Sequence, residues 1–161
     1  MPVTADILES YRRPRAVIAR KLAAGLREDR ALATLMGACG LIFVAQWPGL
    51  ARAAHLEPSV PLDARIGGAL MGVIFLLPPL CYLVAAGSHL VARALGGKGS
   101  FFGARLALFQ ALLAVTPLML LQGLVGGFIG PGPAFLAIGL VVLAAFGWIW
   151  VQMLIGAETW N

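Results

Sequence analysis

The chain has 161 residues, of which 60% are hydrophobic and only 12% are charged, and its mean hydropathy is +0.90. Soluble domains carry about 25% charged residues, so this composition excludes an ordinary soluble protein and indicates a membrane protein. The formal net charge of +5 rests on 12 lysines and arginines, most of which precede residue 31.

The first 30 residues are charged throughout and lack the continuous apolar stretch of a signal peptide. Pro14 has no amide hydrogen to donate, so we expect two short helices at residues 4–12 and 15–28. We predict that residues 1–30 form a basic, amphipathic segment in the cytoplasmic membrane interface. Its apolar residues fall within a helical arc of about 100°: Ile7, Leu8, Tyr11, Ile18, Leu22 and Leu26.

Six basic residues of this segment are candidates for binding anionic lipid headgroups: Arg12, Arg13, Arg15, Arg20, Lys21 and Arg27. Each basic side chain near such a surface contributes about 1 kcal/mol of attraction. The alternative is that these residues only set the topology, because lysines and arginines keep short segments on the cytoplasmic side of a membrane.

Four apolar stretches follow. Residues 31–51 and 66–92 are each bracketed by arginines, and residues 106–157 contain no Asp, Glu, Lys, Arg or His. A Gly- and Pro-rich turn divides the last stretch into residues 106–126 and 134–157. A bilayer core of about 30 Å needs about 20 helical residues. The sequence therefore predicts an all-α polytopic bundle of four transmembrane helices, with residues 31–161 forming one membrane domain.

The basic residues also predict the orientation. Apart from Arg52 and Arg65, all lysines and arginines lie in the N-terminal segment or in the loop between the second and third spans. Positively charged loops stay on the cytoplasmic side, so we expect both termini to be cytoplasmic.

Small residues four positions apart are typical of close helix packing in membranes. Such pairs occur at Gly68 and Gly72 in the second span and at Gly123 and Gly127 in the third. We expect these four glycines to lie at helix contacts.

Prolines interrupt three spans at Pro48, Pro78-Pro79 and Pro117. We expect kinked helices here, because no charged residue accompanies them to build an ion or substrate site. Whether the paired prolines kink or break the second helix is left open by the sequence.

Catalytic and metal-binding patterns are missing from the sequence. The predicted spans contain no carboxylate, and Cys39 and Cys81 fit small packing residues. We expect His89 to be an interfacial or hydrogen-bonded histidine. Residues 96–100 are similar to a phosphate-binding loop, but Lys98 is followed by Gly99 instead of Ser or Thr and no strand precedes it. The sequence thus predicts a non-enzymatic protein without a cofactor or metal.

Residues 96–109, Gly-Gly-Lys-Gly-Ser-Phe-Phe-Gly-Ala-Arg-Leu-Ala-Leu-Phe, and the later Pro117 resemble bacterial members of the Yip-one (Ypt/Rab-interacting) membrane family. Residues 26–33 and 43–48 are similar to small alphaproteobacterial members. The family-like motif residues are Gly103, Ala104, Arg105 and Pro117.

This resemblance implies a helical bundle in the bacterial inner membrane with a cytoplasmic N-terminus. Eukaryotic relatives bind Rab-type GTPases and act in membrane trafficking. They typically have five spans and an Asp-Leu-Tyr-Gly-Pro signature, which this chain lacks. Rab binding is therefore not carried over to it.

We accordingly expect a membrane scaffold or accessory subunit that organises lipid or membrane shape. Its expected partners are anionic lipids and another membrane protein or further copies of itself, and not nucleic acid. The alternative is a small oligomeric channel or carrier for a neutral or lipid-like solute, with Gln110, Thr116 and Gln122 along its path. A lipid-modifying enzyme ranks last because no candidate base or nucleophile is present.

Overall fold

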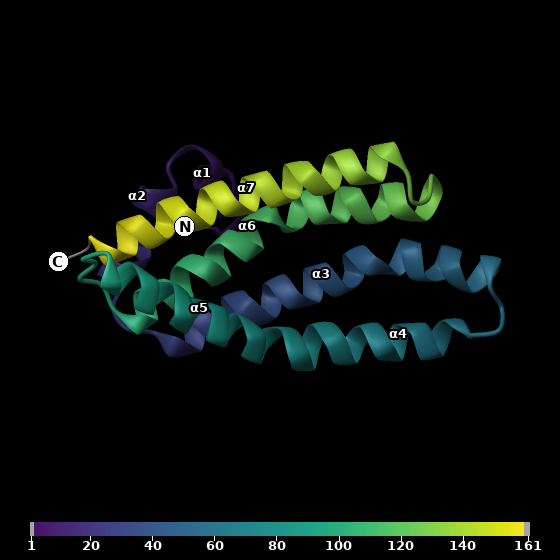
Figure 1. The fold of residues 1–161 in the computed structure, drawn as a ribbon, viewed down its shortest axis with the longest axis horizontal. Helices are drawn as coiled ribbons and strands as arrows, with labels where there is room; N and C mark the ends of the chain where they lie inside the picture. The colour runs from purple at the N-terminus through teal and green to yellow at the C-terminus, as the bar shows by residue number, and fades with distance from the viewer. Residues whose placement is uncertain (1, 160–161) are drawn as a thin grey trace.

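The structure is a computed structural model that describes residues 2–159, and every regular element in this range is helical (Figure 1). The elements are α1 (Val3–Arg12), α2 (Pro14–Ala23), α3 (Glu28–Leu56), α4 (Leu62–Leu70), the π-helix η1 (Met71–Leu76), α5 (Leu77–Ala94), α6 (Phe101–Phe128) and α7 (Pro133–Glu158).

Four helices are long and apolar enough to cross a membrane: Glu28–Leu56, Leu62–Ala94, Phe101–Phe128 and Pro133–Glu158. The second of these is continuous through α4, η1 and α5. The prediction of an all-α bundle with four spans is confirmed. With 26 to 33 residues, the helices measure about 40 to 50 Å and extend beyond a bilayer core of about 30 Å. The predicted spans are shorter because hydropathy detects only the apolar part of each helix.

The helices form two hairpins. One consists of α3 with the α4–α5 helix, the other of α6 with α7, and the two lie closest near the end that carries the C-terminus (Figure 1). Helix α6 is central, since it packs against α3, α5 and α7. Its first half is buried almost continuously from Phe102 to Thr116, with Phe109 fully enclosed.

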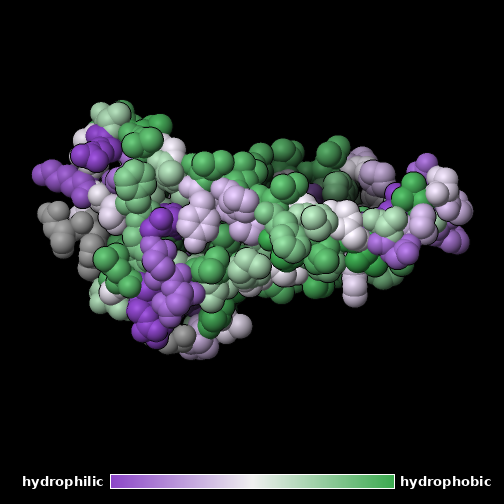
Figure 2. All heavy atoms as spheres, turned by 90° about the horizontal axis from the view of Figure 1, so that it is seen from below, coloured by the Kyte–Doolittle hydropathy of each residue, from purple (hydrophilic) through white to green (hydrophobic). Residues whose placement is uncertain are grey.

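The outer surface suits a bilayer. Figure 2 shows a largely hydrophobic surface along the middle of the molecule, with hydrophilic residues gathered toward the two ends. Helix α7 presents Leu136, Leu140 and Leu143 to the outside. Exposed apolar side chains of this kind are favourable against lipid, whereas water would penalise them.

The helices continue through their prolines. Pro48 lies inside α3 and Pro117 inside α6. Pro78-Pro79 lies in the first turn of α5, which follows the π-helix without interruption, so the second span is not broken there. Pro117 has no N–H for the carbonyl of Leu113, and the Thr116 hydroxyl donates to that oxygen instead at 2.8 Å.

The amphipathic interfacial segment is not confirmed. Two short helices form here, but they pack on α6 and α7 as well as on each other. Of the expected apolar face, Ile18 is fully buried while Leu8 and Leu26 are 72% and 77% exposed. Residue Arg13 leaves helical geometry at φ −137°, which changes the direction of the chain, so one helical projection cannot describe both helices.

The second of these helices also ends earlier than expected. It stops at Ala23, and Gly25 adopts a positive φ of +92° two residues later. A residue with this backbone conformation commonly terminates a helix, and glycine adopts it without steric cost. Residues 24–27 therefore form a turn, and α3 begins at Glu28.

Candidate functional site

The two N-terminal helices are joined by ion pairs. Arg20 lies 2.7 Å from Asp6 and 2.8 Å from Glu9, and Lys21 lies 3.1 Å from Asp6. Burial by itself would raise the pKa of Asp6, but hydrogen bonds and charges from Lys21 and Arg20 outweigh it and hold the pKa below its ordinary value. Ion pairs between α1 and α2 therefore stabilise the packing of these two helices against each other. We call α1 and α2 together the N-terminal hairpin.

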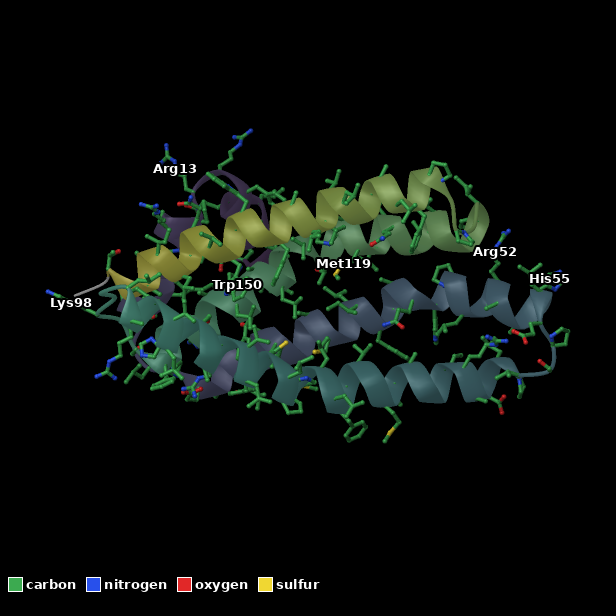
Figure 3. The ribbon with its side chains drawn as sticks, in the orientation of Figure 1. Arg13, Arg52, His55, Lys98, Met119 and Trp150 are labelled. Carbon is green, nitrogen blue, oxygen red and sulfur yellow. The ribbon has the colours of Figure 1, made fainter. Side chains whose placement is uncertain are left out.

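The six residues predicted to bind lipid headgroups make different contacts in the structure. Arg20 and Lys21 bind α1, Arg15 donates to Gln152 on α7 at 2.8 Å, and Arg27 pairs with Asp29. Arg12 and Arg13 are exposed, and Figure 3 shows Arg13 pointing away from the bundle. The six residues therefore do not form one lipid-facing set.

Helix α1 contacts α6 through polar groups. Tyr11 donates its hydroxyl to the carbonyl of Ala114 at 2.8 Å. Gln110 is fully buried and its Nε2 lies 3.5 Å from the Ser10 hydroxyl, while its Oε1 has no partner among the described residues. Gln110 and Thr116, expected along a solute path, are thus both enclosed by protein.

A buried polar contact joins α5 to α7. His89 Nδ1 lies 2.6 Å from Glu158 Oε1, and both side chains are about 95% buried (4% and 5% exposed). Glu158 Oε2 accepts a hydrogen bond from the backbone N–H of Gly99 at 3.0 Å, and its carbonyl accepts one from Lys98 N–H at 3.0 Å. Glu158 therefore fastens α7 to α5 and to the loop between α5 and α6.

Glycines allow this loop to approach Glu158. A Cβ at Gly97 would lie 2.7 Å from Glu158 Oε2, and one at Gly99 would lie 2.6 Å from the carbonyl oxygen of Ala157. Gly96 ends α5 with a φ of +95°, and Ser100 caps α6 by accepting from Gly103 N–H at 3.1 Å. The stretch that is similar to a phosphate-binding loop is therefore folded around a carboxylate of its own chain.

The family-like motif residues Gly103, Ala104 and Arg105 lie in the first two turns of α6, and Gly103 is the one that packs beside Glu158. Gly103 packs against Ala157, and Ala104 is fully buried. Arg105 binds Glu28 at the start of α3, and its guanidinium lies 5.7 Å from the centre of the Tyr82 ring. Pro117 lies about three turns further along α6 and does not belong to the same cluster.

An open groove runs beside the His89–Glu158 pair, between the C-terminal parts of α5 and α7. Its volume is about 880 Å³. The walls are mostly apolar, and the groove is lined by Ser88, Val91, Ala92, Leu95, Gly96, Gly97, Lys98, Trp150, Val151, Leu154, Ile155, Glu158 and Thr159. The indole N–H of Trp150 is buried and has no hydrogen-bond partner within residues 2–159. We call this feature the α5–α7 groove.

A second, smaller cavity of about 390 Å³ lies between α3 and α6. It brings together Gln46 and Gln122, and Gln122 donates to the carbonyl of Phe135 at 3.4 Å. Gln122, a residue of the expected solute path, thus lines this cavity.

The four predicted packing glycines differ in their surroundings. Gly123 and Gly127 lie so close to α3 that a Cβ would overlap the carbonyl of Ala45 or the ring of Pro48. A Cβ at Gly68 or Gly72 would meet nothing within 4 Å. The α6 pair is therefore packed directly against α3, whereas the α4–η1 pair leaves open space where a side chain would begin, as far as the described residues show.

Arg52 fixes the opposite end of the bundle, where Figure 3 shows it beside the turn between α6 and α7. Its guanidinium lies 3.4 Å and 3.5 Å from the carbonyl oxygens of Gly127 and Phe128. A cation at this place stabilises the carbonyl end of a helix.

Sequence reasoning missed Glu158 because it lies one residue beyond the predicted fourth span. The available signal was a single carboxylate directly after a long uncharged stretch, with one histidine near the same end of another span. Buried charges inside membrane proteins commonly pair with one another.

Comparison of the chain with protein-family models, with curated proteins and with solved structures finds no match.

Proposed function

We propose that this protein is a non-enzymatic membrane scaffold or accessory subunit that binds another membrane protein, or a second copy of itself, through α4 and η1. The observation that carries this proposal is the pair Gly68 and Gly72, where an added Cβ would meet no atom of another part of the chain within 4 Å. Large apolar side chains beside it, Met71, Phe75 and Leu76, are exposed as well.

The second glycine pair supports this interpretation. Gly123 and Gly127 let α6 lie directly against α3, which shows how this chain uses the same spacing when a partner helix is present. In lipid, helices associate through such close packing because the hydrophobic effect no longer drives them together. A helix of a partner protein on Gly68 and Gly72 would make the corresponding contact.

We further propose the bacterial inner membrane as its location, with both termini cytoplasmic, and membership of the Yip-one family. The topology is supported by the basic residues of α1, α2 and the α5–α6 loop, which outnumber Arg52 and Arg65 at the other end. The family proposal depends on the resemblance of residues 96–109.

The test is to purify the protein from its native membrane in nanodiscs and identify co-migrating proteins by native gel and mass spectrometry. Gly68→Leu and Gly72→Leu should abolish a stoichiometric complex. At both positions the Cβ of the new side chain meets nothing within 4 Å, and each change replaces glycine by a better helix former. The isolated chain should therefore remain folded.

Gly147→Leu on α7 is the matched control, because a Cβ there also meets nothing within 4 Å. It should leave the complex intact. A complex that survives both changes on the α4–η1 surface, or that Gly147→Leu disrupts equally, would contradict the proposed interface.

The cavity with Gln46 and Gln122 favours a second candidate, a carrier or channel for a neutral solute. Its two amides offer both donors and acceptors inside an otherwise apolar lining. Solute flux into liposomes that contain only this protein, lost in Gln122→Leu, would support this function over the scaffold.

A further inference from the structure

We infer that the α5–α7 groove binds one anionic phospholipid of the surrounding bilayer, with an acyl chain between the helices and the phosphate beside Lys98. This inference goes beyond the scaffold function and does not depend on it, because the groove and the Gly68–Gly72 surface lie on different parts of the second span.

The shape of the groove suits a chain-like amphiphile. Its volume of about 880 Å³ lies within the range of about 300 to 1,000 Å³ that small-molecule sites occupy. Trp150 lines the groove and lies eight residues before Glu158 on α7, which corresponds to about 12 Å along the helix. In Figure 3, Trp150 lies between α7 and α5, whereas Lys98 extends from the end of the bundle.

The groove is built for contact with lipid rather than water. Its walls are formed mainly by Val91, Leu95, Val151, Leu154 and Ile155. Of these, Val91 is 63% exposed and Leu95 is 85% exposed. This apolar surface is open at the side and continues into the outer surface of α5 and α7, so an acyl chain can enter without crossing protein.

The positive charge of Lys98, at the end of the α5–α7 groove, favours an anionic headgroup. Lys98 is exposed and makes no ion pair with the described residues, and its backbone N–H is held by the carbonyl of Glu158. The Glu158 carboxylate, the one acidic group in the lining, is directed at His89 and the Gly99 N–H. The ammonium group of Lys98 therefore remains available to pair with the phosphate of a lipid headgroup.

The experiment is native mass spectrometry of the full chain, delipidated in mild detergent and titrated with phosphatidylglycerol or phosphatidylcholine. We expect one tightly bound phosphatidylglycerol per chain and weaker binding of phosphatidylcholine. Ala92→Phe fills the groove from α5 and should abolish this binding. Val151→Trp fills it from α7, so that a folding defect in one variant does not decide the result.

Lys98→Gln should weaken phosphatidylglycerol binding about five-fold, as expected for the loss of one basic residue near an anionic group, and leave phosphatidylcholine binding unchanged. Arg30→Gln removes one exposed charge that does not line the groove and should change neither. Equal binding of both lipids, binding that persists in the two groove-filling variants, or an equal loss in Arg30→Gln would overturn the inference. A dimer that the groove-filling variants disrupt, with no lipid bound, would assign the groove to a second copy instead.

Discussion

His89 and Glu158, 69 residues apart in the chain, form a buried contact of 2.6 Å between imidazole Nδ1 and carboxylate Oε1. The same carboxylate accepts from the backbone of Gly99. One residue thus holds together the second span, the fourth span and the loop that leads into the third. This is the end of the bundle at which the α5–α7 groove opens.

The first prediction concerns Glu158. Glu158→Ala leaves the His89 ring and the Gly99 N–H without their partner, and a buried polar group that loses its hydrogen bond costs about 1 to 3 kcal/mol. We expect the free energy of unfolding in detergent to fall by about 3 kcal/mol. Glu158→Gln should lose less, because an amide oxygen can still accept from Gly99.

Glu57→Gln is the control for this change, since Glu57 lies in the exposed loop between α3 and α4. Its effect should stay within about 0.5 kcal/mol. A double substitution of His89 and Glu158 should destabilise the protein by less than the sum of the single changes. Strict additivity would show that the two side chains are not coupled.

The second prediction concerns the loop glycines. A Cβ at Gly99 would lie 2.6 Å from the Ala157 carbonyl oxygen and 2.8 Å from the Cα of Glu158. These atoms are backbone and cannot move aside, so Gly99→Ala should cost about 1 to 3 kcal/mol in unfolding free energy. Gly132→Ala, at a turn where a Cβ meets nothing within 4 Å, should be close to neutral. Similar stability of both variants would contradict the close approach.

The sequence was sufficient to predict the four spans because membrane crossing depends on a local property, an apolar stretch of sufficient length. The helix ends were less predictable. Glu28 and Arg105 are charged residues that lie within α3 and α6 and pair with each other across the bundle. Hydropathy excludes such residues from a predicted span, although their ion pair joins the N-terminal parts of the two helices.

The candidate site was harder to predict because its contacts join distant residues. His89 was expected to be hydrogen-bonded or interfacial, but the identity of its partner depends on how α5 and α7 pack. Likewise, Asp6 is buried only because the chain reverses at Arg13 and returns Arg20 and Lys21 to it. A helical projection of residues 1–30 treats them as one straight helix, so it cannot predict a contact that depends on this reversal.

The third prediction is a pH dependence of the N-terminal hairpin. The folded-state pKa of Asp6 lies below the ordinary value of 3.8. A carboxylate whose pKa is lowered by folding contributes its full stability above the unfolded-state value and loses it as the pH falls through the folded-state value. Docking of α1 should therefore be complete at pH 5 to 7 and weaken only below about pH 4.

Protection of the α1 backbone against proteolysis by an acid-stable protease would measure this docking. Asp6→Asn should lower protection at neutral pH and remove most of the acid dependence. Asp63→Asn is the control, because Asp63 is exposed at the start of α4, and it should leave the profile unchanged. Undiminished protection of Asp6→Asn at neutral pH would contradict a role for this carboxylate in the hairpin.

The last prediction compares the two glycine pairs directly. Gly123→Ala would place a Cβ against the carbonyl of Ala45, so α3 and α6 must separate, and the unfolding free energy should fall by about 1 to 3 kcal/mol. Gly68→Ala meets no atom within 4 Å and should raise the stability of the isolated chain by up to about 1 kcal/mol through helix propensity. If α4 binds a partner helix, the same Gly68→Ala change should weaken the complex while it stabilises the subunit. A loss of subunit stability would instead place Gly68 against a helix of its own chain.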